Sequence, residues 1–252
     1  MTAFFDFGLK ITRAEERLRT STESGFALFS AWHVLYLALG AALICLLVRV
    51  YCRAAPKRRR KLGLGIASCA LFVELSRATL LALAGCYGIS HLPLHLCTMA
   101  VYLCFAHALR GGELLGQFLY AFCMPGAISA LLFPDWRRYP PTHPVVLSCF
   151  ALHIFIVAYV LARVVAHELV PDVRATPRAL LLMLALAVPV YIFDYFTGTN
   201  YMFLAYPPPG SPLALFAALG SPGYLLGYIP LLTLAWALIY APWLKPRHAG
   251  RD

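Results

Sequence analysis

A small set of polar side chains interrupts the long apolar runs of this sequence. The members of the set are His33, Glu74, Arg77, His95, His107, Gln117, His153 and Asp194, with Asn200 just beyond a run. Polar and ionisable groups are costly to place in an apolar environment, so they are the first candidates for a functional site. Their chemistry covers proton transfer, metal coordination and the binding of a charged headgroup.

Glu74 and Arg77 are three residues apart within one apolar run. On a helix this spacing places both side chains on one face. Two interpretations follow. The residues form an internal ion pair that cancels two buried charges, or they form a site for a substrate headgroup or a proton. The two interpretations are compatible.

The histidines and one cysteine suggest metal or nucleophile chemistry. His33, His95 and His153 come from three separate runs and show no HxxxH or HxH spacing, so no metal site is predicted. Cys97 is two residues from His95, and on an ideal helix the two side chains face apart. As a nucleophile Cys97 would therefore need His153 from another helix. The alternative is that Cys97 only contributes to packing.

Composition identifies the surroundings in which these residues act. Of the 252 residues, 61% are hydrophobic and 13% are charged, whereas soluble domains are about 45–50% apolar and about 25% charged. These values exclude an ordinary soluble enzyme, a disordered chain and a small secreted scaffold. They indicate a protein whose solvent is mostly lipid. Nothing in the sequence indicates a nucleic-acid partner or a nucleotide cofactor, and the oligomeric state is left open.

Seven apolar windows approach the length of about 20 residues that a membrane-spanning helix needs. Arg110, Gly111, Gly112 and Glu113 separate the third window from the fourth and predict a short turn. We predict an all-α polytopic bundle at 28–243, after an interfacial segment at 1–27 and before a cytoplasmic tail at 244–252. The windows are 28–50, 63–87, 92–109, 113–133, 145–166, 179–197 and 221–243.

Basic residues indicate how the windows are oriented. If the loop 49–61 faces the cytoplasm, fourteen Lys and Arg residues fall on that side and six on the other. Basic residues gather in cytoplasmic loops, which also accounts for the net charge of +10. We therefore expect an outside N-terminus and a cytoplasmic C-terminus in a cell membrane, the bacterial inner membrane.

In this orientation most of the polar set shares the outer half of the bilayer. This shared depth predicts one polar cavity that opens to the outer leaflet or to extracytoplasmic water. The residues at this depth are His33, Arg77, His95, Cys97, His153, Asp194 and Asn200. Aromatic residues at the outer ends are assigned to an interfacial belt; they are Trp136, Tyr139, Tyr195, Tyr201, Tyr206 and Tyr224.

Several short elements, in a fixed order, carry a resemblance to a known group. They are Leu92-Pro93-Leu94-His95-Leu96-Cys97, Phe118-Leu119-Tyr120, Pro125-Gly126-Ala127, Ala130-Leu131-Leu132-Phe133-Pro134-Asp135, His153 and Gly198-Thr199-Asn200-Tyr201-Met202-Phe203-Leu204. Over about residues 70–240 they resemble the YwaF-like bacterial integral membrane proteins. That family has no assigned activity, so the resemblance implies a membrane bundle and no reaction.

The same layout is more distantly similar to the TMEM-type ether-phospholipid acyltransferases. Pro93, His95, residues 131–134 and His153 are the matching points. The acyltransferases carry a proposed nucleophilic Cys where this chain has Leu94, so an acyl-cysteine intermediate at that position is excluded. The similarity implies action on lipid acyl groups, with His95 and His153 as base and orienter.

Around these two histidines, the expected substrate-binding residues are Glu74, Arg77, Cys97, Asp194 and Asn200, and the expected partners are membrane lipids. Two other functions remain open at this stage. The polar cavity could carry a small solute or a proton, or its polar groups could only hold helices together.

Overall fold

The computed structural model describes residues 25–244, and within this range it is helical and has no strand. The principal helices are α2 (Ala31–Arg53), α3 (Pro56–Leu83), α4 (Leu96–Arg110), α5 (Glu113–Phe118), α6 (Met124–Leu132), α7 (Pro144–Val165), α8 (Thr176–Thr197) and α9 (Tyr228–Tyr240). The prediction of an all-α bundle is confirmed. Nearly all of the predicted interfacial segment and cytoplasmic tail lie outside the described residues.

Six helical segments are long and apolar enough to cross a membrane. They are Ala31–Arg53, Pro56–Leu83, Glu113–Arg138, Pro144–Val165, Val173–Thr197 and Gly223–Trp243. The third predicted window is shorter than expected, because Leu92–His95 is not helical and α4 has only 15 residues. At 1.5 Å per residue α4 measures about 22 Å, which is less than the hydrocarbon core of about 30 Å. A seventh span therefore stays a prediction.

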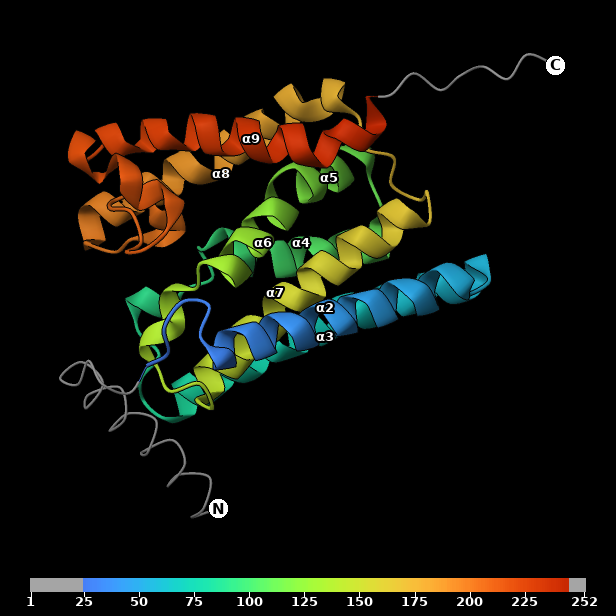
Figure 1. Cartoon of the computed structure of the whole chain (residues 1–252), viewed down its shortest axis with the longest axis horizontal. Helices are drawn as coiled ribbons and strands as arrows, with labels where there is room; N and C mark the ends of the chain where they lie inside the picture. The colour runs from blue at the N-terminus through green and yellow to red at the C-terminus, as the bar shows by residue number, and fades with distance from the viewer. Residues whose placement is uncertain (1–24, 245–252) are drawn as a thin grey trace.

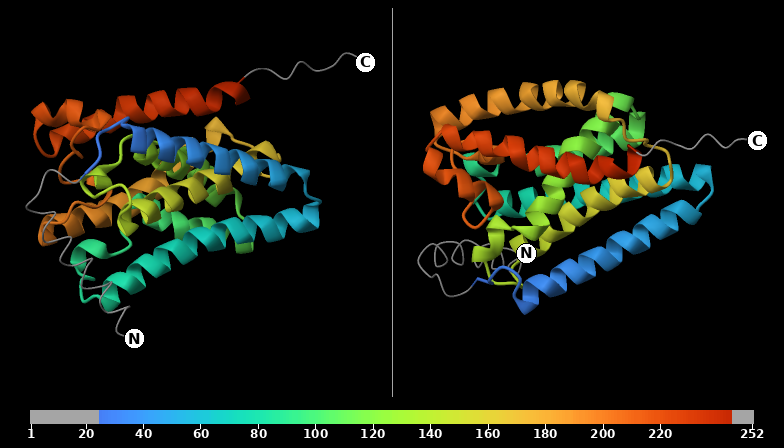
Figure 2. Two further views of the ribbon diagram at one scale, coloured as in Figure 1. Left: turned by 60° about the horizontal axis from the view of Figure 1, so that its bottom comes forward. Right: turned by 45° about the horizontal axis from the view of Figure 1, so that its top comes forward.

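Helix α7 lies at the centre of the bundle and packs against α2, α3, α4 and α6. In Figure 1, α2 and α3 run along one side of α7, and α8 and α9 lie on the opposite side, beyond α5. The right-hand view of Figure 2 shows the same order, with α8 and α9 on one side of α7 and α2 and α3 on the other. In the most apolar window of α7, 61% of residues are buried, against 11% for α2 and 17% for α8. The peripheral helices thus present apolar side chains outward, as a lipid environment requires.

Local signals explain where several helices begin and end. Pro56 and Pro144 occupy the first turns of α3 and α7, where a missing N–H costs nothing. Gly111 and Gly112 have φ values of 71° and 116° and form the predicted short turn between α4 and α5. A π-helical turn at Leu119–Cys123 joins α5 to α6 and makes them one apolar segment.

The orientation of the bundle is testable with reporter fusions. We expect a phosphatase reporter that folds only outside the cytoplasm to be active when inserted in the loop 198–220. The same reporter should be inactive when fused to the C-terminus, because we expect the side with fourteen basic residues to face the cytoplasm. An active C-terminal fusion would overturn the orientation.

Candidate functional site

His95 occupies the N-cap position of α4 and is half-buried. Its Nδ1 accepts a hydrogen bond from the backbone N–H of Met202, at 3.3 Å between the two nitrogens. Its ring lies edge-on to that of Tyr201, with 4.9 Å between ring centroids. Since Nδ1 is an acceptor, the neutral imidazole carries its proton on Nε2.

The loop that holds His95 is a turn at Tyr201–Phe203. Asp194 near the end of α8 accepts hydrogen bonds at one carboxylate oxygen from the N–H of Tyr201, at 3.0 Å, and from the hydroxyl of Thr199, at 2.6 Å. Met202 and Phe203 have φ values of 52° and 54°. Two consecutive non-glycine residues in the left-handed region cost energy and persist only where their surroundings enforce them.

Buried and half-buried tyrosines supply that enforcement. The hydroxyl of Tyr228 donates to the carbonyl of Met202, at 2.9 Å, and the hydroxyl of Tyr224 donates to the carbonyl of Phe203, at 2.6 Å. Tyr201 itself donates to the carbonyl of Ile89, at 2.6 Å. Assigning Tyr201 and Tyr224 to an interfacial belt was therefore wrong, because both are almost fully buried. Backbone carbonyls in a strained turn need hydrogen-bond donors, and tyrosine hydroxyls can supply them.

His153 lies on the buried face of α7. Its Nδ1 donates to the carbonyl of Cys149, at 2.6 Å, so the neutral ring has its lone pair on Nε2. Its ring stacks on Trp136, with 5.0 Å between centroids and 24° between planes. The Nε2 of His153 and the Nε1 of Trp136 are buried and have no hydrogen-bond partner among the described residues.

Glu74 and Arg77 form a bidentate ion pair on α3. The Arg77 Nε lies 3.0 Å from one carboxylate oxygen of Glu74, and one terminal nitrogen lies 2.7 Å from the other. The Glu74 side chain is 2% exposed and that of Arg77 is 21% exposed. The internal ion pair is thus present. It occupies both oxygens of Glu74 and leaves one terminal nitrogen of Arg77 without a protein partner among the described residues.

Part of the set predicted from its depth lies within electrostatic range of His95 or His153. The charges of Asp135, Asp194 and Arg77 all act on the imidazole of His95. Those of His95 and Asp135 act on His153. We call Arg77, His95, Asp135, His153 and Asp194 the histidine cluster. Cys97, on the first turn of α4, is half-buried, and the charges of Asp135 and Glu74 act on its thiol.

A family model covers most of this chain. The model of the TMEM164 family matches residues 28–240, a stretch that contains every residue of the histidine cluster. The chain belongs to the TMEM164 family. It is therefore a multi-pass membrane protein of a TMEM family, in agreement with its six apolar helices. Comparisons with curated proteins and with solved structures found no match. The resemblance to the YwaF-like proteins, the similarity to the acyltransferases and the choice of membrane stay predictions.

One residue of the cluster, Asp135, is not predicted by the hydropathy of the sequence. Asp135 follows Pro134 directly after α6 and begins a 3₁₀ turn, Asp135–Arg138. Its position within the Ala130–Asp135 element was noted, but it lies outside the apolar runs. A search limited to those runs could not select it.

Two residues of the expected cavity are engaged elsewhere. His33 accepts a hydrogen bond at Nδ1 from the N–H of Phe29 and donates from Nε2 to the carbonyl of Leu131, each at 2.9 Å. Asn200 accepts from the N–H groups of Ala205 and Tyr206 and donates to the carbonyl of Tyr206. The contacts of His33 join α2 to α6, and those of Asn200 close its own loop.

The remaining polar helix residues lie elsewhere. His107 is near the other end of α4 and shares a hydrogen bond with the hydroxyl of Tyr159, at 2.8 Å. Gln117 bonds to the backbone of Val170 and Asp172. Across residues 25–244, no group of three or more His, Cys, Asp or Glu side chains has an arrangement that could hold a metal ion.

Proposed function

We propose that the histidine cluster transfers or hydrolyses the acyl groups of membrane lipids, with His153 as general base and His95 as hydrogen-bond donor to the reacting carbonyl. The observation that carries the proposal is the Nε2 atom of His153. It is buried, it holds the lone pair of the neutral ring, and it has no partner among the described residues. An imidazole oriented by a backbone carbonyl and free at its other nitrogen is suited to accept a proton.

His95 supplies the complementary group. Its Nδ1 is occupied by the Met202 N–H, so its Nε2–H is the atom available to a ligand. A fixed N–H donor stabilises the negative charge that develops on a carbonyl oxygen during acyl transfer. The assignment differs from the expected base and orienter, because a backbone group, and not the other histidine, orients each ring.

The proposed reaction joins a lipid ester to a nucleophile, which is water or a lipid hydroxyl. His153 Nε2 takes the proton of the nucleophile as its oxygen bonds to the ester carbonyl carbon. The oxyanion of the tetrahedral intermediate accepts a hydrogen bond from His95 Nε2–H. The ester C–O bond then breaks, and the proton on His153 passes to the leaving alkoxide. No cysteine nucleophile is required, which is consistent with Leu94 at the position discussed above.

Arg77 is suited to bind the polar part of the lipid. Two nitrogens of the Arg77 guanidinium donate to Glu74, and the remaining terminal nitrogen of Arg77 can donate to a phosphate or carbonyl oxygen. The Arg77 side chain is partly exposed, and the buried Glu74 holds its guanidinium in place.

The proposal is tested with purified full-length chain in vesicles of acyl-labelled phospholipid, with and without a lipid hydroxyl acceptor. We expect His153→Gln and His95→Gln each to lower the turnover of label at least about a hundredfold, the usual range for general acid–base groups. His167→Gln is the matched control, because His167 is exposed and lies outside the cluster.

If His153→Gln and His95→Gln fold and turn over the label at the unaltered rate, the proposal that the histidine cluster acts on lipid acyl groups is refuted. Flux of a labelled solute or of protons that depends on Glu74 would favour a transporter instead. A loss of folded protein as the sole effect of all three substitutions, at His95, His153 and Glu74, would favour a structural role.

A further inference from the structure

We propose that a basic pocket at the opposite end of α4 from His95 binds a phosphate group, either that of an anionic phospholipid or a soluble phosphate. The pocket encloses about 380 Å³. It is lined by Pro56, Arg60, His107, Ala108, Leu109, Arg110, Gly111, Arg163 and Glu168. This site is separate from the histidine cluster, because His95 and Arg110 stand at the two ends of α4, about 22 Å apart.

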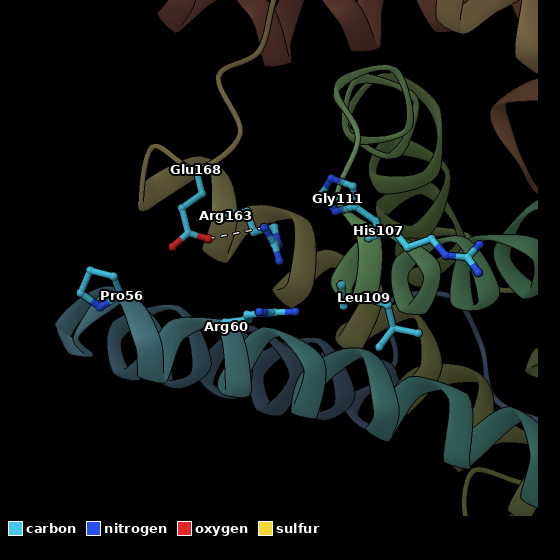
Figure 3. A pocket seen from close by; sticks show the side chains of 9 residues that line it. Pro56, Arg60, His107, Leu109, Gly111, Arg163 and Glu168 are labelled. Atoms are coloured by element: carbon cyan, nitrogen blue, oxygen red, sulfur yellow. Dashed lines mark hydrogen bonds and ion pairs between the residues drawn. The ribbon is translucent and has the colours of Figure 1, made fainter.

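Three arginines line the pocket; Arg110 ends α4, and the other two come from α3 and α7. Arg60 comes from the first turns of α3 and Arg163 from the last turn of α7, and Figure 3 shows them on neighbouring walls. Glu168, just after α7, lies beside Arg163. The pocket is thus built from segments that are distant in the sequence and that the packing of α3 against α7 brings together.

The charges of the pocket do not balance. Among the described residues, Glu168 is the only acidic one that lines it, and this carboxylate is shared. Its oxygens lie 3.5 Å from a terminal nitrogen of Arg163 and 3.9 Å from one of Arg59. It also accepts a hydrogen bond from the hydroxyl of Tyr51, at 2.5 Å between the two oxygens. Arg60 has no acidic partner among residues 25–244, and the Nε of Arg163 is buried with no hydrogen-bond partner there. The pocket therefore offers guanidinium donors that the described part of the chain does not satisfy.

These features fit a phosphate group. The planar guanidinium presents donors in a fork that matches phosphate oxygens, and two forks from different helices can hold one group from two sides. The volume lies within the range of small-molecule sites, about 300–1,000 Å³.

The position of the pocket agrees with this ligand. The basic run 57–61 of α3 begins beside it, and basic pockets between helices on the cytoplasmic side of a membrane bind anionic headgroups.

The test compares substitutions inside and beside the pocket. The full chain in neutral detergent is mixed with phosphatidylglycerol, and retained lipid is measured by native mass spectrometry. We expect Arg60→Gln and Arg163→Gln each to weaken lipid retention about tenfold, because each variant loses one or two charge-assisted hydrogen bonds. Arg58→Gln is the matched control, because Arg58 is exposed on the same turn of α3 and does not line the pocket. We expect less than about a twofold change for Arg58→Gln.

Arg163 also packs over the ring of Tyr159, so its removal could impair folding. Arg163→Lys retains the positive charge and removes the planar fork. We expect it to fold and to weaken retention nearly as much as Arg163→Gln does. Equal losses in the Arg58 and Arg60 variants would overturn the proposal in favour of a diffuse basic surface, and so would unchanged retention in the Arg60 variant.

A second arm identifies the source of the phosphate. If inorganic phosphate binds alone and displaces the lipid in an Arg60-dependent manner, the ligand is a soluble phosphate. If only the phospholipid binds and inorganic phosphate fails to displace it, the ligand is a headgroup. Both results support a phosphate site, and failure of both probes to bind overturns it.

Discussion

Replacing Arg77 with Met is expected to destabilise the folded chain by about 3–5 kcal/mol, because it leaves the carboxylate of Glu74 buried without a partner. Glu74 is 2% exposed, and both of its oxygens bond to Arg77. No other described cation forms an ion pair with it. The measurement is the free energy of unfolding of the purified chain in detergent micelles.

The matched control for this prediction removes both charges. In Glu74→Gln/Arg77→Met no ionised group is left unpaired, so we expect most of the lost stability to return. Replacing a whole buried pair is often nearly neutral, whereas breaking it is costly. Equal stability of the single and double variants would contradict the prediction, because it would show that the unpaired carboxylate of Glu74 is not the source of the loss.

Replacing Asp194 with Ala is expected to cost about 3 kcal/mol or more, because hydrogen bonds to a charged acceptor contribute about 1.5–3 kcal/mol each. The carboxylate receives the N–H of Tyr201 and the hydroxyl of Thr199, and it holds the left-handed turn at Met202 and Phe203. Relaxation of that turn would withdraw the Met202 N–H from His95. We therefore expect the unfolding energy and the lipid turnover to fall together.

Two variants separate these contributions. Asp194→Asn keeps an oxygen acceptor at the turn and should lose less stability than Asp194→Ala. Thr199→Val removes one of the two donors and should cost about 1 kcal/mol. A stable Asp194→Ala protein with full turnover would contradict the proposal that this carboxylate positions His95.

The helices themselves follow closely from the hydropathy of the sequence. The window 145–166 corresponds to α7 and the window 179–197 lies within α8. The main error is in the third window, where Leu92–His95 is apolar but not helical. Apolar composition reports the environment of a segment and not its backbone conformation, so it could not show that His95 caps a helix and is absent from its first turn.

The histidine cluster was partly predictable for a similar reason. Residue position along a spanning helix predicts depth, and on this ground the sequence predicted one shared level for Arg77, His95, His153 and Asp194. The same argument included His33 and Asn200, whose polar atoms the structure commits to Leu131 and to the loop around Tyr206. It also omitted Asp135, which reaches the cluster from a turn outside the apolar runs.

The sequence by itself therefore determined the membrane environment and the course of the helices, because these depend on composition. It also predicted a shared depth for the polar residues, from a constant rise per residue. Tertiary structure alone decided which way each side chain points and what it meets. The tautomers of His95 and His153 depend on backbone groups of Met202 and Cys149. The basic pocket depends on the approach of α3 to α7. Rotation about a helix axis and contacts between distant segments arise only when the whole bundle packs.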